Sequence, residues 1–183
     1  IKHPSLKVIA FEPSFLNLNL LSRNININNL SNNILVNQLP LSNKENSYEY
    51  FKETSLIEGA AINLFDSLEK NYSDINDNLV SKTYIYGTSP NFFIKNKILD
   101  IPSYIKIDVD GLEFEVLQGM SDFLSDERLK EILIELEETN NNSKTREEKL
   151  LIENGFLLDK KKRSYKSKGG LIKTYNYIFK RNI

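Results

Sequence analysis

The segment Tyr104-Ile105-Lys106-Ile107-Asp108-Val109-Asp110-Gly111-Leu112-Glu113 determines the fold that we expect for this chain. Its first half alternates β-branched residues with others, as a buried strand does. Beyond Gly111, apolar residues recur at helical spacing as far as Leu124. A strand that turns at a glycine into a helix is typical of an open α/β sheet, in which ligands bind beyond the carboxyl ends of the strands. The segment therefore predicts a site around three carboxylates, Asp108, Asp110 and Glu113.

The composition narrows the class of protein. With 183 residues, 40% of them hydrophobic, the chain is long enough for one domain with a core, and we expect a single domain over residues 1–183. The net charge of −1 provides no field to attract nucleic acid or a membrane surface, so we expect neither as a partner. The chain has no cysteine and one histidine, which excludes disulfides, thiolate chemistry and a structural zinc site. No apolar run approaches the roughly 20 residues that span a bilayer, and we expect a cytoplasmic protein without a metal site.

The periodic segments alternate along the chain. Helices are expected from Phe15, after Pro90, beyond Gly111 and over 146–153, and strands over 6–11, 34–41, 80–86, 104–108 and 132–136. Residues 47–51 indicate a short edge strand, and 52–78 are ambiguous between a lid and an insert, with a helical turn at 64–68. Residues 156–158 and 174–179 indicate a C-terminal antiparallel hairpin. We therefore expect an α/β fold with a mostly parallel sheet and helices on both faces.

Glu12 ends the first expected strand, and Ser14 is a good cap for the helix that follows. An acid at this point is how doubly wound folds hold the ribose hydroxyls of a nucleotide-like cofactor. The alternative is a solvated acid near a helix N-terminus, stabilised by the helix dipole.

Asp108 has two interpretations as well. It could accept or orient a substrate hydroxyl proton, with Asp110 and Glu113 tuning its pKa or sharing a cation. The structural alternative pairs Asp108 with Lys106 or a backbone amide and makes Asp110 the helix cap. The Asp-Val-Asp-Gly order also resembles the nucleophile motif of haloacid-dehalogenase-type phosphatases, with Asp108 as nucleophile and Asp110 as acid/base, but Leu112 stands where that family expects Thr or Val.

The basic run Lys160–Arg163 could contact an anionic substrate, but a solvated hairpin loop is the commoner reason for such a run. Tyr175, Tyr177 and Phe179 alternate at strand spacing, and we expect them to pack in the core.

Several blocks resemble the FkbM family of S-adenosylmethionine-dependent methyltransferases, in the expected order and over nearly the full chain. These blocks are residues 8–14, 86–89, 105–113 with 116–119, 134–135 and 176–179. The most specific motifs are Phe-Glu-Pro at 11–13 and Lys-Ile-Asp-Val-Asp-Gly at 106–111.

The resemblance implies a Rossmann-like class I methyltransferase fold that uses S-adenosyl-L-methionine, usually to methylate a hydroxyl of a sugar or small metabolite. Glu12 matches the acid that binds the cofactor ribose, and Asp108 and Lys106 match the strand that faces cofactor and acceptor. Asp110 and Glu113 are substrate-side candidates. The family's first strand and glycine-rich cofactor loop would precede Ile1, so we expect this chain to be truncated and a non-catalytic binding or scaffold module to be the main alternative. Asn91 stands where relatives often carry Asp.

Overall fold

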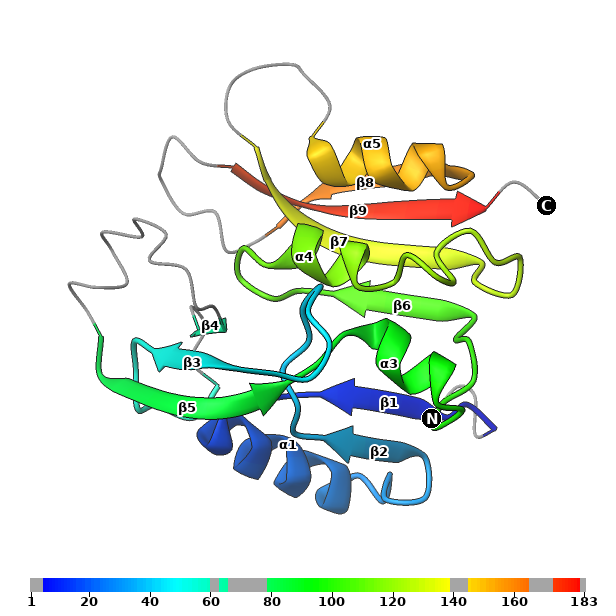
Figure 1. The fold of residues 1–183 in the computed structure, drawn as a ribbon. Coiled ribbons are helices and arrows are strands. Elements are labelled where there is room, and N and C mark those ends of the chain that lie inside the picture. Colours follow the sequence, from blue (N-terminus) through cyan, green and yellow to red (C-terminus); the bar gives the residue numbers. More distant parts are fainter. Residues whose placement is uncertain (1–4, 60–62, 66–78, 139–144, 165–172, 182–183) are drawn as a thin grey trace. The chain divides into compact units, whose positions relative to one another are not determined.

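The computed structural model describes residues 5–59, 63–65, 79–138, 145–164 and 173–181 (Figure 1). The chain forms two compact units, residues 1–88 and residues 89–183, which are described separately below. The single domain expected over the whole chain stays a prediction.

The first unit begins with a strand, a helix and a parallel strand. Strand β1 (Val8–Phe11) pairs in parallel with β2 (Ile34–Asn37), and helix α1 (Phe15–Ile27) connects them. Ser14 caps the helix as expected, because its side chain accepts a hydrogen bond from the Asn17 amide. Of the apolar residues of α1, Ile25 is buried but Phe15 is 73% exposed.

The rest of this unit is an antiparallel sheet with the order β4-β3-β5. Its strands are β3 (Ser47–Glu53), β4 (Asn63–Phe65) and β5 (Ser81–Gly87). The expectation of an edge strand at 47–51 is therefore wrong, because β3 is hydrogen-bonded on both sides. Residues 63–65 are extended rather than helical, and the remainder of the predicted turn at 64–68 lies outside the described residues.

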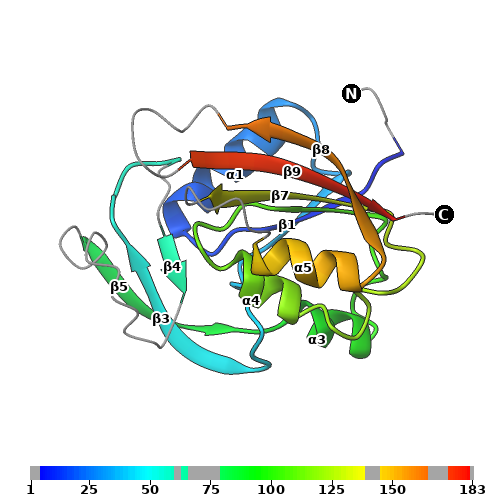
Figure 2. The ribbon, with the colours of Figure 1, turned by 90° about the horizontal axis from the view of Figure 1, so that it is seen from above.

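The second unit is built on a four-stranded sheet. Its order is β6-β7-β9-β8, from β6 (Tyr104–Ile107), β7 (Glu131–Glu138), β9 (Lys173–Arg181) and β8 (Phe156–Arg163). Helices α3 (Pro90–Lys95), α4 (Glu113–Gln118) and α5 (Arg146–Glu153) belong to the same unit. Helices α4 and α5 lie on one face of this sheet (Figure 2). Ser89 caps α3, which begins at Pro90, and α5 ends at Glu153, as the expected range 146–153 predicts.

The core of the second unit follows the apolar periodicity beyond Gly111. Six residues of that series are buried, namely Leu112, Val116, Leu117, Met120, Phe123 and Leu124. Helix α4 itself stops at Gln118, and the last three of these residues lie in turns. Gly119 accounts for the early end, because glycine disfavours a helix interior. The sheet contributes a second buried set, namely Ile132, Ile134, Leu136, Phe156, Tyr177 and Phe179.

The expectation of a mostly parallel sheet is wrong for the described strands. Only β1–β2 and β6–β7 are parallel, whereas the other four of the six pairs are antiparallel. Strand β9 folds back between β7 and β8, and β3 forms antiparallel pairs with both neighbours. The C-terminal hairpin is confirmed, while a Rossmann-like arrangement with helices on both faces stays a prediction.

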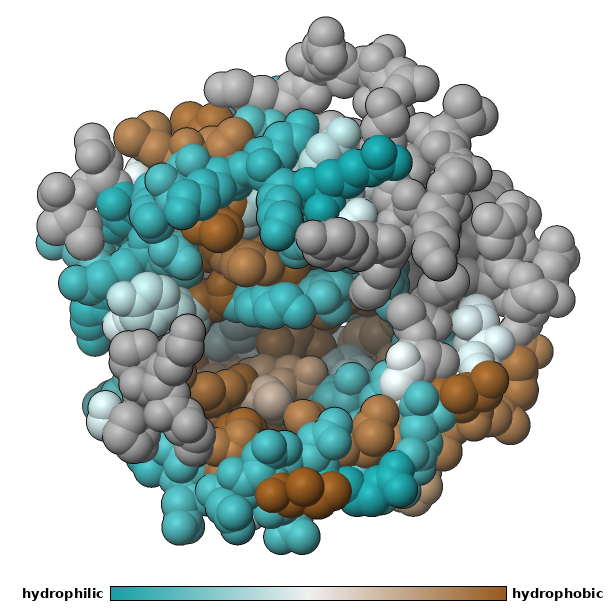
Figure 3. Space-filling model, turned by 180° about the vertical axis from the view of Figure 1, so that it is seen from behind, coloured by the Kyte–Doolittle hydropathy of each residue, from teal (hydrophilic) through white to brown (hydrophobic). Residues whose placement is uncertain are grey.

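Several large apolar side chains reach the surface, among them Leu35, Ile27 and Ile57. Figure 3 shows such apolar residues interspersed with hydrophilic ones on one face of the molecule. Within the described residues, no helix is long and apolar enough to cross a membrane.

Candidate functional site

Glu12 lies directly after β1, at its carboxyl end, and is half-buried. Its backbone N–H donates to the carbonyl oxygen of Asn37 at 3.0 Å, which continues the ladder of β1 and β2 by one residue. Its side chain turns back on the chain, because Oε1 accepts a hydrogen bond from the Ser14 amide at 2.9 Å. This geometry fixes a carboxylate at the strand end where the sequence predicts a ribose-binding acid.

A second carboxylate, Glu53 at the end of β3, meets the same serine from the other side. The Ser14 hydroxyl donates to Glu53 Oε1 at 2.7 Å, and both residues are buried, with 2% and 9% of their surfaces exposed. Ser14 thus connects Glu53 to Glu12 through its hydroxyl and its amide. The sequence analysis did not identify Glu53. The signal for it was that Glu49, Phe51 and Glu53 alternate along the strand, which places Glu53 on the same face as the apolar Phe51.

Asp108 follows β6 and forms an ion pair with Lys106, whose Nζ lies 2.9 Å from Oδ2. The expectation that the strand includes Asp108 is wrong, because β6 ends at Ile107. Both partners are open to solvent, with 27% of the Asp108 side chain and 63% of the Lys106 side chain exposed. The pair is the one that the structural alternative predicts. Because the pair is exposed, it contributes little stability and leaves the carboxylate accessible to a ligand.

The turn between β6 and α4 carries the other two predicted acids. Asp110 has φ 47° and Gly111 has φ 102°, so the chain turns through two left-handed residues. The helix cap is Leu112, without a side-chain hydrogen bond, so the expectation that Asp110 caps α4 is wrong.

Glu113 is the more enclosed of these acids. Its Oε1 accepts a hydrogen bond from the Gly111 amide at 3.1 Å. Burial raises the pKa of Glu113 above its ordinary value of 4.5, against the lowering effect of backbone hydrogen bonds, and the neighbouring charge of Asp110 raises it further. A carboxyl group with a raised pKa at a strand end is a candidate for proton exchange with a substrate.

Lys106 pairs with Asp108, and Asp110 lies near enough to Glu113 to raise its pKa. All four residues belong to the second unit, whereas Glu12 belongs to the first. Among the described residues, no three acid, histidine or cysteine side chains converge as metal ligands.

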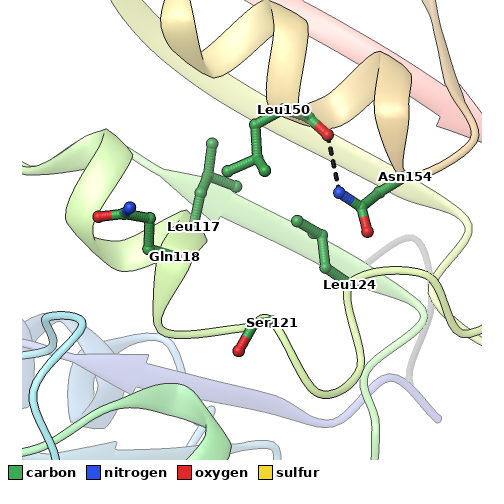
Figure 4. Close-up of a pocket in the computed structure, with 6 residues that line it drawn as sticks. All are labelled: Leu117, Gln118, Ser121, Leu124, Leu150 and Asn154. Carbon is green, nitrogen blue, oxygen red and sulfur yellow. Dashed lines mark hydrogen bonds between the residues drawn. The ribbon is translucent and has the colours of Figure 1, made fainter.

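A shallow pocket of about 270 Å³ lies elsewhere in the second unit, between the end of α4 and α5 (Figure 4). Its lining is Leu117, Gln118, Ser121, Leu124, Leu150 and Asn154. None of these residues is acidic or basic, so this pocket supplies no group for proton transfer.

Two further positions from the sequence are structural in their contacts. The Asn91 amide nitrogen donates to Ser121 Oγ at 3.0 Å, while its oxygen accepts from the Asp122 amide at 3.2 Å, so this side chain joins α3 to the turn after α4. The basic run Lys160–Arg163 lies in strand β8 and not in the hairpin loop, which corrects the expectation. Lys161 Nζ lies 4.4 Å from the ring centre of Tyr175.

The family model described as "Methyltransferase FkbM domain" matches residues 2–160, a span that includes every predicted site residue. No curated protein matches the chain. No solved structure matches the chain either.

Proposed function

The chain belongs to the FkbM methyltransferase domain family, and from that membership we propose that it acts as an S-adenosylmethionine-dependent methyltransferase on a hydroxyl of a sugar or small metabolite. The family match over residues 2–160 is the observation that carries the proposal. It covers Glu12 together with the Lys106–Glu113 segment.

Glu12 fits the ribose-binding role by its position and chemistry. A carboxylate accepts hydrogen bonds from two vicinal hydroxyl groups, and Glu12 stands half-buried at a strand end with its orientation fixed by the Ser14 amide. Ser14 is itself held by Glu53, so Glu53 acts as a positioning residue in this proposal. When bound, the cofactor would supply a methyl group on a positively charged sulfonium sulfur. The neutral thioether that remains after the transfer is a good leaving group.

Asp108 and Lys106 are the proposed catalytic residues. Asp108 orients the acceptor hydroxyl and takes its proton as the methyl group is transferred to oxygen. Lys106 Nζ, 2.9 Å from Asp108 Oδ2, holds that carboxylate in place. Asp110 and Glu113 face the acceptor side in the proposal, and the cytoplasm is the proposed compartment.

The first test is calorimetric titration of S-adenosylhomocysteine into the full-length protein, beside Glu12→Gln and the matched control Glu127→Gln in an exposed loop. A hydrogen bond to a charged group is worth about 1.5–3 kcal/mol, so we expect Glu12→Gln to weaken binding by about 10-fold or more and Glu127→Gln to leave it unchanged.

Equal affinity of all three proteins would remove Glu12 from the cofactor site. No binding by the wild-type protein would contradict the methyltransferase proposal and favour a binding or scaffold module of the same family. Thermal melting of each variant separates loss of binding from loss of folding.

A further inference from the structure

The outer face of the β3–β5 pair carries a regular grid of aromatic and basic side chains. The two strands lie side by side (Figure 1), and their register places three like pairs opposite one another. From one end to the other these pairs are Tyr48–Tyr86, Tyr50–Tyr84 and Lys52–Lys82. We call these six residues the tyrosine–lysine face.

The four tyrosine rings form a connected surface. Tyr48 and Tyr84 stack with ring centres 5.5 Å apart and planes inclined by 27°, and Tyr50 lies 5.2 Å from Tyr84. Tyr48, Tyr50 and Tyr84 are 59%, 42% and 61% exposed. The alternate residues of β3 are buried on the opposite side, so the sheet packs inward there and presents the tyrosines outward. A cluster of exposed aromatic rings is characteristic of a binding surface.

The lysine pair at the end of the grid gives the surface its charge preference. Lys82 Nζ lies 3.8 Å from the ring centre of Tyr50, and Lys52, directly opposite Lys82, is only 9% exposed. In the described part of the chain neither ammonium forms an ion pair. Like charges placed directly opposite each other on a sheet are unfavourable, so an anion bound between them would relieve their repulsion.

We propose that the tyrosine–lysine face binds an acidic saccharide. The C–H faces of its rings lie on the tyrosines, and a carboxylate, sulfate or phosphate group lies between Lys52 and Lys82. A single-stranded nucleic acid fits this surface less well, because it requires cations along the whole backbone path, and here they are confined to one end of the grid. None of the six residues of this face has a role in the proposed methyl transfer, so the two proposals can be tested separately.

The experiment is a titration of the full-length protein, without cofactor, with trigalacturonate and with a heparin tetrasaccharide. Neutral maltotriose and a thymidine oligonucleotide are titrated in parallel. We expect at least one acidic saccharide to bind with a Kd of about 1 mM or tighter, and at least about 10-fold more tightly than maltotriose. The double variant Tyr48→Ser/Tyr84→Ser should weaken this binding at least about 10-fold, and Lys82→Gln should reduce its salt dependence. Tyr104→Ser is the matched control, because Tyr104 is 64% exposed on β6, outside the face.

Four results would overturn the proposal. The first two are that neither acidic saccharide binds, or that maltotriose binds as tightly as the acidic saccharides. The third is that the tyrosine and lysine variants bind the acidic saccharide as the wild-type protein does. The fourth is that the oligonucleotide binds more tightly than the saccharides and that the same variants lose this binding. Self-association that the tyrosine variant abolishes would assign the face to a second copy of the chain instead. Circular dichroism of each variant establishes that it is folded.

Discussion

Replacing Arg181 should destabilise the second unit more than any exposed charge would. The guanidinium at the end of β9 donates to three backbone carbonyl oxygens, those of Leu129 at 3.0 Å, Asn154 at 2.8 Å and Leu124 at 2.6 Å. It also lies over the ring of buried Phe156, at 4.3 Å. These partners come from the turn after α4, the loop before β7 and the end of α5, so one side chain connects three segments.

Arg181→Met keeps the apolar stem over Phe156 and removes all three hydrogen bonds. Each is worth about 1 kcal/mol net, so we expect a loss of about 3 kcal/mol in the free energy of unfolding, a large share of the 5–15 kcal/mol typical of a domain. Arg181→Lys should lose about 2 kcal/mol, because one ammonium cannot reach carbonyls spread around a planar fork.

Urea unfolding followed by far-UV circular dichroism measures these changes. The control is Arg128→Met, in which an equally basic side chain is removed from an exposed pair with Asp126. We expect the control to unfold at the wild-type urea concentration. A loss below about 1 kcal/mol for Arg181→Met would refute the argument that these carbonyls depend on the guanidinium.

Three further predictions concern stability. Ser14→Ala removes the cap of α1 and the donor to Glu53, so it should cost about 2 kcal/mol in urea unfolding, whereas exposed Ser31→Ala should cost nothing measurable. Gly155→Ala should lose about 1–2 kcal/mol, because Gly155 has φ 86° and a Cβ there would lie 2.9 Å from Arg181 Nη1; an unchanged urea midpoint would contradict this. Because folding raises the pKa of Glu113, the stability of the wild-type protein should fall as the pH rises from 4.5 through the folded-state pKa. Glu113→Gln should flatten this part of the curve of urea midpoint against pH. Parallel curves for the two proteins would exclude the effect.

Local signals predicted the local structure well. Ser14 and Pro90 mark the starts of α1 and α3, because the start of a helix depends on a few adjacent residues. The apolar series beyond Gly111 is buried throughout, because periodicity reports which face of a segment avoids water.

The direction and the order of the strands were harder to predict from the sequence, because period-two alternation is the same in parallel and antiparallel sheets. Nothing local distinguishes β3 as a central strand or places β9 between β7 and β8. The same limit applies to the site. Asp108 was expected within the strand, but β6 ends one residue earlier. The contact between Ser14 and Glu53 joins residues 39 positions apart, which no local pattern reports.

The basic run of β8 has a consequence for how the protein avoids aggregation. Strand β8 is the outer strand of its described sheet, and such a strand offers unpaired backbone groups to any extended chain that approaches. Its exposed residues from Asp159 to Arg163 are all charged, and the register shifts between Leu158 and Lys160. An incoming strand would have to desolvate these charges and match a distorted edge, so the basic run disfavours the pairing of two copies of this protein sheet to sheet.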